Sequence, residues 1–545
     1  MSPRVLVVGA GLAGLRAAIA AAETGARVRV VSKVHPLSSH SVAATGGINV
    51  ALLPGDVPEH VEDTLRDGGY LGDRDAVEKL CSQAGDDVRV LESWGVPFDR
   101  GSDERLGVKS LAGSAKARTV YVGNHTGRAM LQAIWQRAMA AGIEVVADCM
   151  LVDLVLESDL CRGGVFLDLG SGELSTAEAD ATVLATGGLG QLYRPTTNAV
   201  ICTGDGTAAA FRAGATLVDM EMTQFYPACF PSHGVCVTEE LRAHGARFIN
   251  NESEYFMERY DPVCRDMAGR DALSRALYQE RAEGREVFLD CRRVPRELLE
   301  GPLAAFVALS RRFEGVEPSQ DCLPVVPGMH YHMGGIRTDL DGRTSIEGLF
   351  AAGECACLSV HGANRIGGNG LLEAIVMGRI AGSAAAASAL SDVRSTDAHS
   401  KVMEHRAEEA RAMLVGDARA AGGGDELICL RETLGAQMMA NAGIIREERS
   451  LREGLDTVVG LERTHRSLPA GEYGRRFNQQ GRRWLEMRNL LSLAAVVIRS
   501  ALWRCESRGA HQRADFPTTG DDPRHTLVRT GASGQWFFEA VASRS

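Results

Sequence analysis

The segment 32–49, SKVHPLSSHSVAATGGIN, holds the first residues that could do chemistry. His40 stands in a run of small and hydroxyl side chains that ends at Gly46 and Gly47. Small residues allow close approach of the backbone to a ligand, and glycine adopts positive φ without steric cost. The composition favours a segment that lies along a flat ligand with His40 as a reactive side chain, and the alternative is a polar surface loop.

The elements before this segment must position it. Val5 to Val8 form an apolar run typical of a buried parallel strand, and an alanine-rich helix is predicted up to Glu23. Between them stand Gly9, Gly11 and Gly14 in a GxGxxG pattern. In this setting the helix N-terminus binds a pyrophosphate, so the sequence predicts a dinucleotide site.

The type of dinucleotide follows from the residues at the end of the second strand, 27–32. Ser32 and Lys33 stand where an NAD enzyme places its ribose-binding acid, which disfavours NAD. Later strand-then-glycine turns at 181–188 and 348–354, with Asp205 between two glycines and Glu354 after the third strand, favour FAD. The cofactor domain is therefore expected to come from both ends of a long segment, with an inserted domain between them.

Size and composition limit the number of domains and the classes of protein that fit the sequence. The chain has 545 residues, a net charge of −11 and 45% apolar residues, which indicate several globular domains and disfavour nucleic-acid binding. Its 13 scattered cysteines predict reduced thiols, buried small residues at Cys355 and Cys357, and no metal site. The chain begins directly at a strand, and the apolar run 490–503 is too short to span a membrane, so a cytoplasmic protein without a signal peptide is expected.

Several longer motifs occur in one order along nearly the whole chain. They are GAGLAGL at Gly9, SKVHPLSSHSVAATGGI at Ser32, LATGGLGQLY at Leu184, VTEELR at Val237, AGRDALSR at Ala268, MHYHMGGI at Met329, GLFAAGECACLSVHGANRIGGNGLLEAIVMGR at Gly348 and ESRGAHQRADFP at Glu506. With these motifs the chain resembles the flavoprotein subunit of the succinate dehydrogenase/fumarate reductase family.

The resemblance implies an α/β fold: a Rossmann-type FAD-binding domain with an inserted α+β capping domain and a C-terminal helical domain. The expected ranges are 1–215 and 341–390 for the FAD-binding domain, 216–340 for the capping domain, and 391–504 for the helices, with apolar spacing at Leu427, Leu430 and Leu434. The segment 505–545 is expected to be irregular.

The resemblance also implies that His40 is linked covalently to the flavin, although Ser39 stands where the family often has arginine. The alternative is a free histidine beside non-covalent FAD. Gly370 and Leu371 open a helix whose N–H groups would face the flavin. The expected cofactor-binding residues are Gly9, Gly11, Gly14, Ser32, Lys33, His40, Ser41, Gly46, Gly47, Asp205, Glu354, Gly370 and Leu371.

The implied substrate is a four-carbon dicarboxylate. Thr238, His330 and Arg365 match the family's carboxylate-binding residues, whereas Tyr226 replaces a histidine and Ala228 a threonine. The spacing from Tyr226 to Thr238 equals that of the family, so Tyr226 is a true substitution. A neutral phenol with a pKa of about 10 donates a weaker hydrogen bond than a histidinium. This end of the site is therefore weaker or shaped for another group.

The implied catalytic residue is Arg270, which would exchange a proton with the substrate carbon while flavin N5 exchanges a hydride. Glu239 and Arg242, three residues apart, match the family's proton relay; without the resemblance they would be interpreted as a surface ion pair.

The expected function is interconversion of succinate and fumarate, with electrons passed to or from an iron–sulfur subunit. The resemblance implies this separate subunit and, as is often the case in the family, a membrane anchor subunit as a further partner. The first alternative is a related oxidase, such as an L-aspartate oxidase, which usually lacks the linking histidine but which the changed site at Tyr226 keeps open. The second is a non-catalytic flavoprotein that serves as an assembly scaffold, which would not need Arg270, His330 and Arg365.

Overall fold

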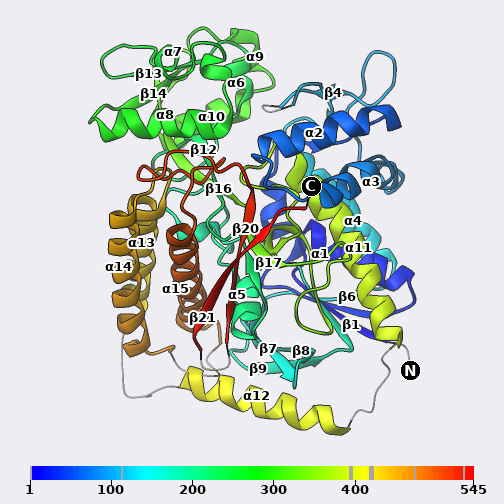
Figure 1. Ribbon diagram of the computed structural model, residues 1–545. Coiled ribbons are helices and arrows are strands. Elements are labelled where there is room, and N and C mark those ends of the chain that lie inside the picture. The colour runs from blue at the N-terminus through cyan, green and yellow to red at the C-terminus, as the bar shows by residue number, and fades with distance from the viewer. Residues whose placement is uncertain are drawn as a thin grey trace.

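The computed structural model describes residues 3–111, 114–391, 397–415, 423–471, 474, 476–531 and 534–544. Figure 1 shows the parallel sheet at the centre, the inserted domain above it, and the C-terminal helices beside and below it.

A five-stranded parallel sheet forms the dinucleotide-binding domain, in the order β18-β10-β1-β2-β6. β1 is fully apolar after its first residue, as expected for a strand covered on both faces. Four strands precede the insertion and β18 follows it, which agrees with a cofactor domain built from both ends of a long segment. The bounds are β1 Arg4–Val8, β2 Arg27–Val31, β6 Glu144–Val146, β10 Ala181–Leu184 and β18 Leu349–Ala351.

Two helices, α1 Leu12–Glu23 and α11 Asn369–Ser391, cross at short distance on this sheet. A Cβ placed on Gly378 would lie 2.6 Å from the Ala13 carbonyl oxygen, and one on Gly382 would lie 2.1 Å from that of Ala17. The two glycines therefore allow the helix backbones to touch. Within the described residues, α11 is also the one helix long and apolar enough to cross a membrane, but half of that window is buried inside the protein.

Further elements extend the domain around the sheet. An antiparallel three-stranded sheet, β7-β8-β9, lies below it in Figure 1, and a small sheet, β3-β5-β4, lies near helices α2 to α4. The bounds are β3 Ile48–Asn49, α2 Val57–Asp67, α3 Arg74–Ser93, β4 Val108–Lys109, β5 Thr119–Val120, α4 Thr126–Ala140, β7 Cys149–Glu157, β8 Leu160–Asp168, β9 Leu174–Glu178 and α5 Asp205–Arg212.

The capping domain has a core of its own, formed by buried residues from Tyr226 to Val325. Its strand β12 pairs antiparallel with β16, which returns the chain to the dinucleotide-binding domain. Figure 1 shows the domain in green above the parallel sheet. The bounds are β12 Thr223–Cys229, α6 Glu240–Ala243, β13 Arg247–Asn250, α7 Met257–Tyr260, α8 Arg270–Ala282, β14 Val287–Asp290, α9 Arg296–Glu300, α10 Ala304–Phe313, β15 Leu323–Pro324 and β16 Val326–His332.

The two ends of the predicted insertion, 216–340, belong to a different sheet. This sheet has the order β19-β17-β11-β20-β21 and joins both ends of the insertion to the C-terminal segment. The prediction of an irregular 505–545 segment is therefore wrong for the hairpin of β20 and β21, whose pairing partner β11 lies about 300 residues earlier. The bounds are β11 Leu217–Val218, β17 Gly335–Arg337, β19 Ala356–Cys357, β20 Arg524–Thr530 and β21 Trp536–Ala542.

The C-terminal helices pack on the dinucleotide-binding domain. Leu427, Leu430 and Leu434 are buried, so the predicted apolar face of that helix is the packed one. Helix α12 lies along the sheet β7-β8-β9. The bounds are α12 Asp397–Val415, α13 Gly424–Ala442, α14 Glu448–Ser467 and α15 Gln479–Trp503.

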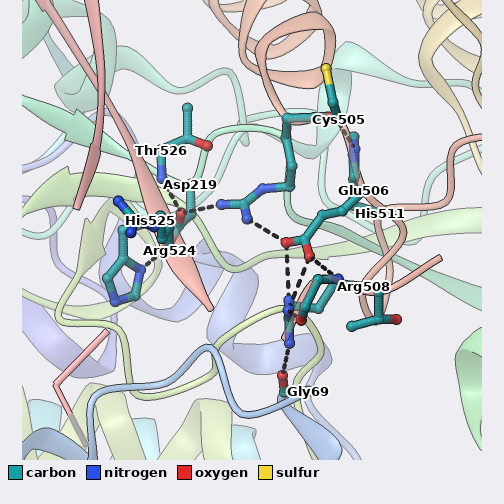
Figure 2. A network of polar contacts seen from close by, with 12 residues as sticks. Gly69, Asp219, Cys505, Glu506, Arg508, His511, Arg524, His525 and Thr526 are labelled. Carbon is teal, nitrogen blue, oxygen red and sulfur yellow. Dashed lines mark hydrogen bonds and ion pairs between the residues drawn. The ribbon is translucent and has the colours of Figure 1, made fainter. Parts of the chain in front are cut away.

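A buried charge network ties the C-terminal segment to the rest of the protein (Figure 2). His525 Nδ1 lies 2.6 Å from Asp219 Oδ2, and its Nε2 lies 3.3 Å from Asp73 Oδ1. Arg508 pairs with Glu506 and donates to the Gly69 carbonyl at 2.7 Å. Although burial disfavours the imidazolium, the two aspartates raise the pKa of His525 to about 10. His525 is therefore charged at neutral pH and links β20 to Asp219 and Asp73 through ion pairs.

Candidate active site

A cavity of about 690 Å³ lies between the dinucleotide-binding and capping domains. Its lining contains all predicted site residues except Gly14 and Arg242. A Cβ on Gly14 would lie 1.9 Å from the Gly9 carbonyl oxygen, so Gly14 serves the close packing of α1 behind the turn. The predicted residues on the lining are Gly9, Gly11, Ser32, Lys33, His40, Ser41, Gly46, Gly47, Asp205, Tyr226, Thr238, Glu239, Arg270, His330, Glu354, Arg365, Gly370 and Leu371.

The turn between β1 and α1 has the shape of an anion site. Gly9 adopts a φ of +110°, and a Cβ there would lie 2.2 Å from the Ala185 carbonyl oxygen. Helix α1 begins at Leu12, whose N–H donates to Ser41 Oγ at 3.2 Å. This bond holds Ser41 against the turn, and Gly11, Leu12 and Ala13 at the start of α1 line the cavity. The free N–H groups of a first helical turn favour an anion.

His40 opens the short 3₁₀ turn His40–Ala43 and faces the cavity. Burial lowers the pKa of His40 to about 4, so its imidazole is neutral at pH 7. The Ala199 N–H donates to His40 Nδ1 at 3.3 Å. Because an amide nitrogen can only donate here, Nδ1 carries a lone pair, which is the state of a neutral imidazole substituted at Nε2.

Lys33, whose side chain is 12% exposed, lies at the start of segment 32–49, where an NAD enzyme would place its ribose-binding acid. Its Nζ donates to Asp205 Oδ2 at 2.7 Å and to Glu486 Oε1 at 3.1 Å. Although burial disfavours the ammonium, these carboxylates raise the pKa of Lys33. Asp205 is therefore oriented by Lys33, and Glu486, on α15, links the helical domain to Lys33.

Glu354 closes the same region beneath the capping domain. Its Oε1 accepts the His332 N–H at 3.1 Å, and a Cβ on Gly188 would lie 2.3 Å from that oxygen. Burial raises the pKa of Glu354 to about 7. Near neutral pH this carboxyl can therefore donate as well as accept a hydrogen bond.

Arg270, the first residue of α8, lies next to the predicted relay residues Glu239 and Arg242. Its Nε donates to Glu239 Oε1 at 2.7 Å, and Arg242 Nη2 lies 3.8 Å from the same oxygen. Arg270 Nη1 is buried without a partner among the described residues. Burial favours the protonated carboxyl, but the charges of Arg270 and Arg242 lower the pKa of Glu239, which is therefore ionised between two guanidinium groups.

Arg365 and His330 face Arg270 across the cavity. The Arg365 guanidinium lies 4.4 Å from the centroid of the Tyr331 ring and donates to Gln224 Oε1 at 3.2 Å. Burial, with the nearby charge of Arg270, lowers its pKa to about 10, so it remains charged at neutral pH. Burial and the two arginine charges hold the pKa of His330 well below its ordinary value, and its Nδ1 lies 2.9 Å from Thr197 Oγ1.

Tyr226 does not direct its proton into the cavity. Its hydroxyl donates to the Val237 carbonyl at 2.8 Å. The ring forms a wall of the site, with its centroid 5.1 Å from the His330 ring and 5.2 Å from the Arg270 guanidinium carbon. Tyr226 thus contributes an aromatic face where the family resemblance led us to expect a hydrogen-bond donor.

The α11 N-terminus supplies unpaired backbone groups to the cavity. The helix begins at Asn369, so the Gly370 and Leu371 N–H groups lie in its first turn, and both residues line the cavity. Such groups and the helix dipole favour negative charge on a bound ligand. That they face a flavin stays a prediction.

Four residues outside the predicted set contact predicted site residues. Gln224 and Tyr331 position Arg365, Thr197 holds His330, and Glu486 reaches Lys33 from a distant helix. Tyr331 lies inside the MHYHMGGI motif and pairs with Gln224 across β16 and β12, so the contacts of both residues follow from strand pairing that only the folded chain defines.

The lining fits a flavin dinucleotide together with an anionic substrate. Buried polar atoms without a partner in the described residues stand around the cavity: Ser39 Oγ, Thr186 Oγ1, Arg270 Nη1 and Arg365 Nε. Such atoms are costly unless a ligand satisfies them. Across the described ranges, no group of three or more histidine, cysteine, aspartate or glutamate side chains could hold a metal ion.

Comparisons with known proteins agree with this geometry. The FAD binding domain family matches residues 4–371, and the fumarate reductase flavoprotein C-terminal family matches residues 431–543. The chain is 37% identical to the fumarate reductase flavoprotein subunit of Mycobacterium tuberculosis, over 97% of this chain and 95% of that protein. It is 36% identical to the succinate dehydrogenase flavoprotein subunit of Rickettsia bellii, over 97% of this chain and 93% of that protein.

Solved structures give the same result. The structure of E. coli quinol fumarate reductase FrdA matches with a TM-score of 0.95 and 31% identity, over 100% of this chain and 97% of that one. Mycobacterium smegmatis Sdh1 matches with a TM-score of 0.88 and 31% identity, over 99% and 94%. The chain is therefore an FAD-containing oxidoreductase and belongs to the family of succinate dehydrogenase and fumarate reductase flavoprotein subunits.

Proposed function

We propose that this protein interconverts succinate and fumarate at the cavity between its two domains. The observation that carries the proposal is the buried Arg270–Glu239–Arg242 chain, which faces Arg365 and His330 in the same cavity as the dinucleotide-binding turn. Bound FAD supplies the acceptor or donor of a hydride equivalent.

The residues of the chain bind and orient the dicarboxylate. Arg365 keeps its charge at neutral pH, and its planar guanidinium pairs with a carboxylate through two N–H groups. Neutral His330 and the Thr238 hydroxyl add hydrogen bonds. Arg365 is held by Tyr331 and Gln224, so it is fixed in position before the substrate arrives.

Arg270 gives or takes the proton at the substrate carbon. A guanidinium is a weak acid, so this proton moves only as charge develops on the carbon and only if the proton is replaced. Glu239, 2.7 Å from Arg270 Nε, and Arg242 beyond it form the replacement route. Ionised Glu239 stabilises charged Arg270 between turnovers and raises its pKa.

FAD attachment through His40 is part of the same proposal. The support is the neutral imidazole, whose Nδ1 accepts the Ala199 N–H. Lys33, Asp205 and Glu354 would hold the dinucleotide, and the Gly370 and Leu371 N–H groups would face the flavin ring.

The chain is one subunit of a larger assembly in this proposal. Named relatives are flavoprotein subunits, and one neighbouring structure is described as quinol-fumarate reductase with menaquinol molecules. We propose that electrons pass to or from an iron–sulfur subunit, and that a membrane anchor holds the complex at the cytoplasmic face of a membrane.

Steady-state assays with artificial electron carriers test the function. The purified protein with FAD should reduce fumarate with reduced viologen and oxidise succinate with an oxidised dye. Turnover of L-aspartate with oxygen, without turnover of either dicarboxylate, would instead establish the oxidase. The specific observation that favours this second candidate is Tyr226, whose ring occupies the position of a histidine that binds a carboxylate in the family.

A further inference from the structure

Two cysteines face each other at the substrate end of the capping domain. Cys229 is the last residue of β12, and Cys236 follows after a short connection. The two residues form an isolated antiparallel bridge, and both are free thiols. None of the proposed catalytic or binding roles uses either of them.

The hydrogen bonds around the pair define its geometry. The Val237 N–H donates to the Ala228 carbonyl at 2.8 Å, and the Phe230 N–H donates to the Val235 carbonyl at 2.9 Å. These two bonds flank the cysteines, so Cys229 and Cys236 are a non-hydrogen-bonded antiparallel pair. In such pairs the Cα atoms lie about 4.5 Å apart, which falls within the range of about 4.4–6.8 Å that a disulfide spans.

The two thiols differ in access. Cys229 is fully buried and packs against Gly328, whereas Cys236 is half-buried and lines the cavity. Burial and the adjacent Cys236 thiol hold the pKa of Cys229 well above its ordinary value. A small oxidant that enters the cavity therefore reaches Cys236 first, with Cys229 beside it as the resolving thiol.

We propose that Cys229 and Cys236 form a reversible disulfide when the protein meets hydrogen peroxide, and that this bond lowers turnover. Peroxide oxidises the Cys236 thiol to a sulfenic acid and releases one water. The Cys229 thiol then attacks that sulfur, the S–S bond forms, and a second water leaves. Two electrons pass from the thiol pair to peroxide, and a dithiol reductant returns them.

The effect on activity rests on the proposed function. Thr238 and Glu239 follow Cys236 by two and three residues, and Tyr226 precedes Cys229 by three. Formation of the S–S bond draws the two sulfurs to about 2.05 Å, which pulls the backbone at Cys236 and the adjoining Thr238–Glu239 segment toward β12. Since a displacement of about 1 Å in positioning groups can cost up to about 10²-fold in rate, a loss of roughly tenfold or more is expected.

Peptide mapping tests the bond without reference to activity. The holoprotein is treated with hydrogen peroxide, freed of it with catalase, alkylated with iodoacetamide and digested with trypsin. The tryptic peptide 213–242 contains both cysteines and no other. We expect it unalkylated and lighter by two hydrogen atoms, and doubly alkylated after dithiothreitol. Double alkylation after peroxide, or oxidation of Cys236 to a sulfinic acid without a link, would overturn the proposal.

Matched variants test the consequence. Fumarate reduction in each protein is compared before and after peroxide. Wild type and Cys264→Ser, which changes an exposed thiol of the same domain, should lose activity and regain it with dithiothreitol. Cys229→Ser and Cys236→Ser should show neither the reversible loss nor the link. An equal reversible loss in all four proteins would refute the regulatory effect, whereas a link in a protein that turns over no dicarboxylate would leave the bond established and refute the proposed function.

Discussion

Replacement of Arg270 by glutamine tests the proton-transfer role most sharply. The variant removes the group that we assign to the substrate proton but keeps a polar side chain in the buried site. Loss of a general acid costs about 10²–10⁴-fold in rate. Loss of a hydrogen bond from a charged group costs a further 1.5–3 kcal/mol or so, about tenfold to a hundredfold. We therefore expect kcat/KM for fumarate to fall by at least about 10³-fold, or roughly 4 kcal/mol.

The same substitution changes Glu239 in a defined direction. Arg270 Nε lies 2.7 Å from Glu239 Oε1, whereas Arg242 lies 3.8 Å from it. The variant thus removes the nearer of two cations, and the pKa of Glu239 should rise. Any residual activity should show a new pH dependence that follows the ionisation of the Glu239 carboxyl.

The assay is anaerobic fumarate reduction with reduced viologen, alongside the flavin absorbance spectrum. Arg275→Gln is the matched control, because Arg275 lies on the same helix and pairs with Asp271 at 2.8 Å, away from the cavity lining. The control should keep near-normal turnover. Fumarate turnover by Arg270→Gln within tenfold of wild type, with FAD bound, would refute the assignment of Arg270.

Other predictions concern the covalent flavin link, the substituted carboxylate site at Tyr226 and the buried ion pairs of His525. His40→Ser should release its flavin on acid precipitation, whereas wild type should keep it bound to the denatured chain; flavin that stays attached to the variant would identify another linking residue. Tyr226→His should raise kcat/KM for fumarate about fivefold, equivalent to about 1 kcal/mol for one added hydrogen bond; a decrease would mean that the aromatic wall is needed as it stands. Because folding raises the pKa of His525 from 6.5 to about 10, its contribution is complete below pH 6.5 and is lost as the pH rises toward 10. This contribution is at most roughly 5 kcal/mol. The His525→Gln variant should therefore have a lower Tm than wild type at pH 6.5, and its Tm should fall less as the pH rises toward 10. Parallel plots of Tm against pH for the two proteins would contradict the stabilising role of His525.

Local sequence patterns could predict the dinucleotide-binding part of the site. Backbone contacts require glycine at positions 9 and 14, since a side chain at either would collide with a carbonyl oxygen. Such steric requirements are local, so they can be recognised from the glycine positions in the sequence. The covalent role of His40 and the domain boundaries stay predictions.

Contacts between distant parts of the chain could not be predicted in this way. The hairpin of β20 and β21 forms against β11, and Glu486 reaches Lys33 across more than 400 residues. Neither the two-residue strand β11 nor a lone glutamate on α15 carries a periodic signal. These features depend on how the domains pack.

Tyr226 shows that the orientation of a side chain within the site also could not be predicted from the sequence. Its position in the site follows from its spacing to Thr238, but the direction of its hydroxyl does not. The Val237 carbonyl, eleven residues later, accepts that proton at 2.8 Å. A buried carbonyl without a partner is costly, so this local demand can outweigh a bond to the substrate.

The most direct test of the central claim is the reoxidation of reduced flavin by fumarate. The purified protein is reduced without oxygen, fumarate is added, and the oxidised flavin absorbance is followed in a stopped-flow instrument. We predict rapid and stoichiometric return of that absorbance in wild type, and a return at least about 10³-fold slower in Arg270→Gln. If fumarate leaves the flavin of the wild-type protein reduced while iminoaspartate or a longer diacid reoxidises it, the site acts on another substrate and the succinate–fumarate assignment is contradicted.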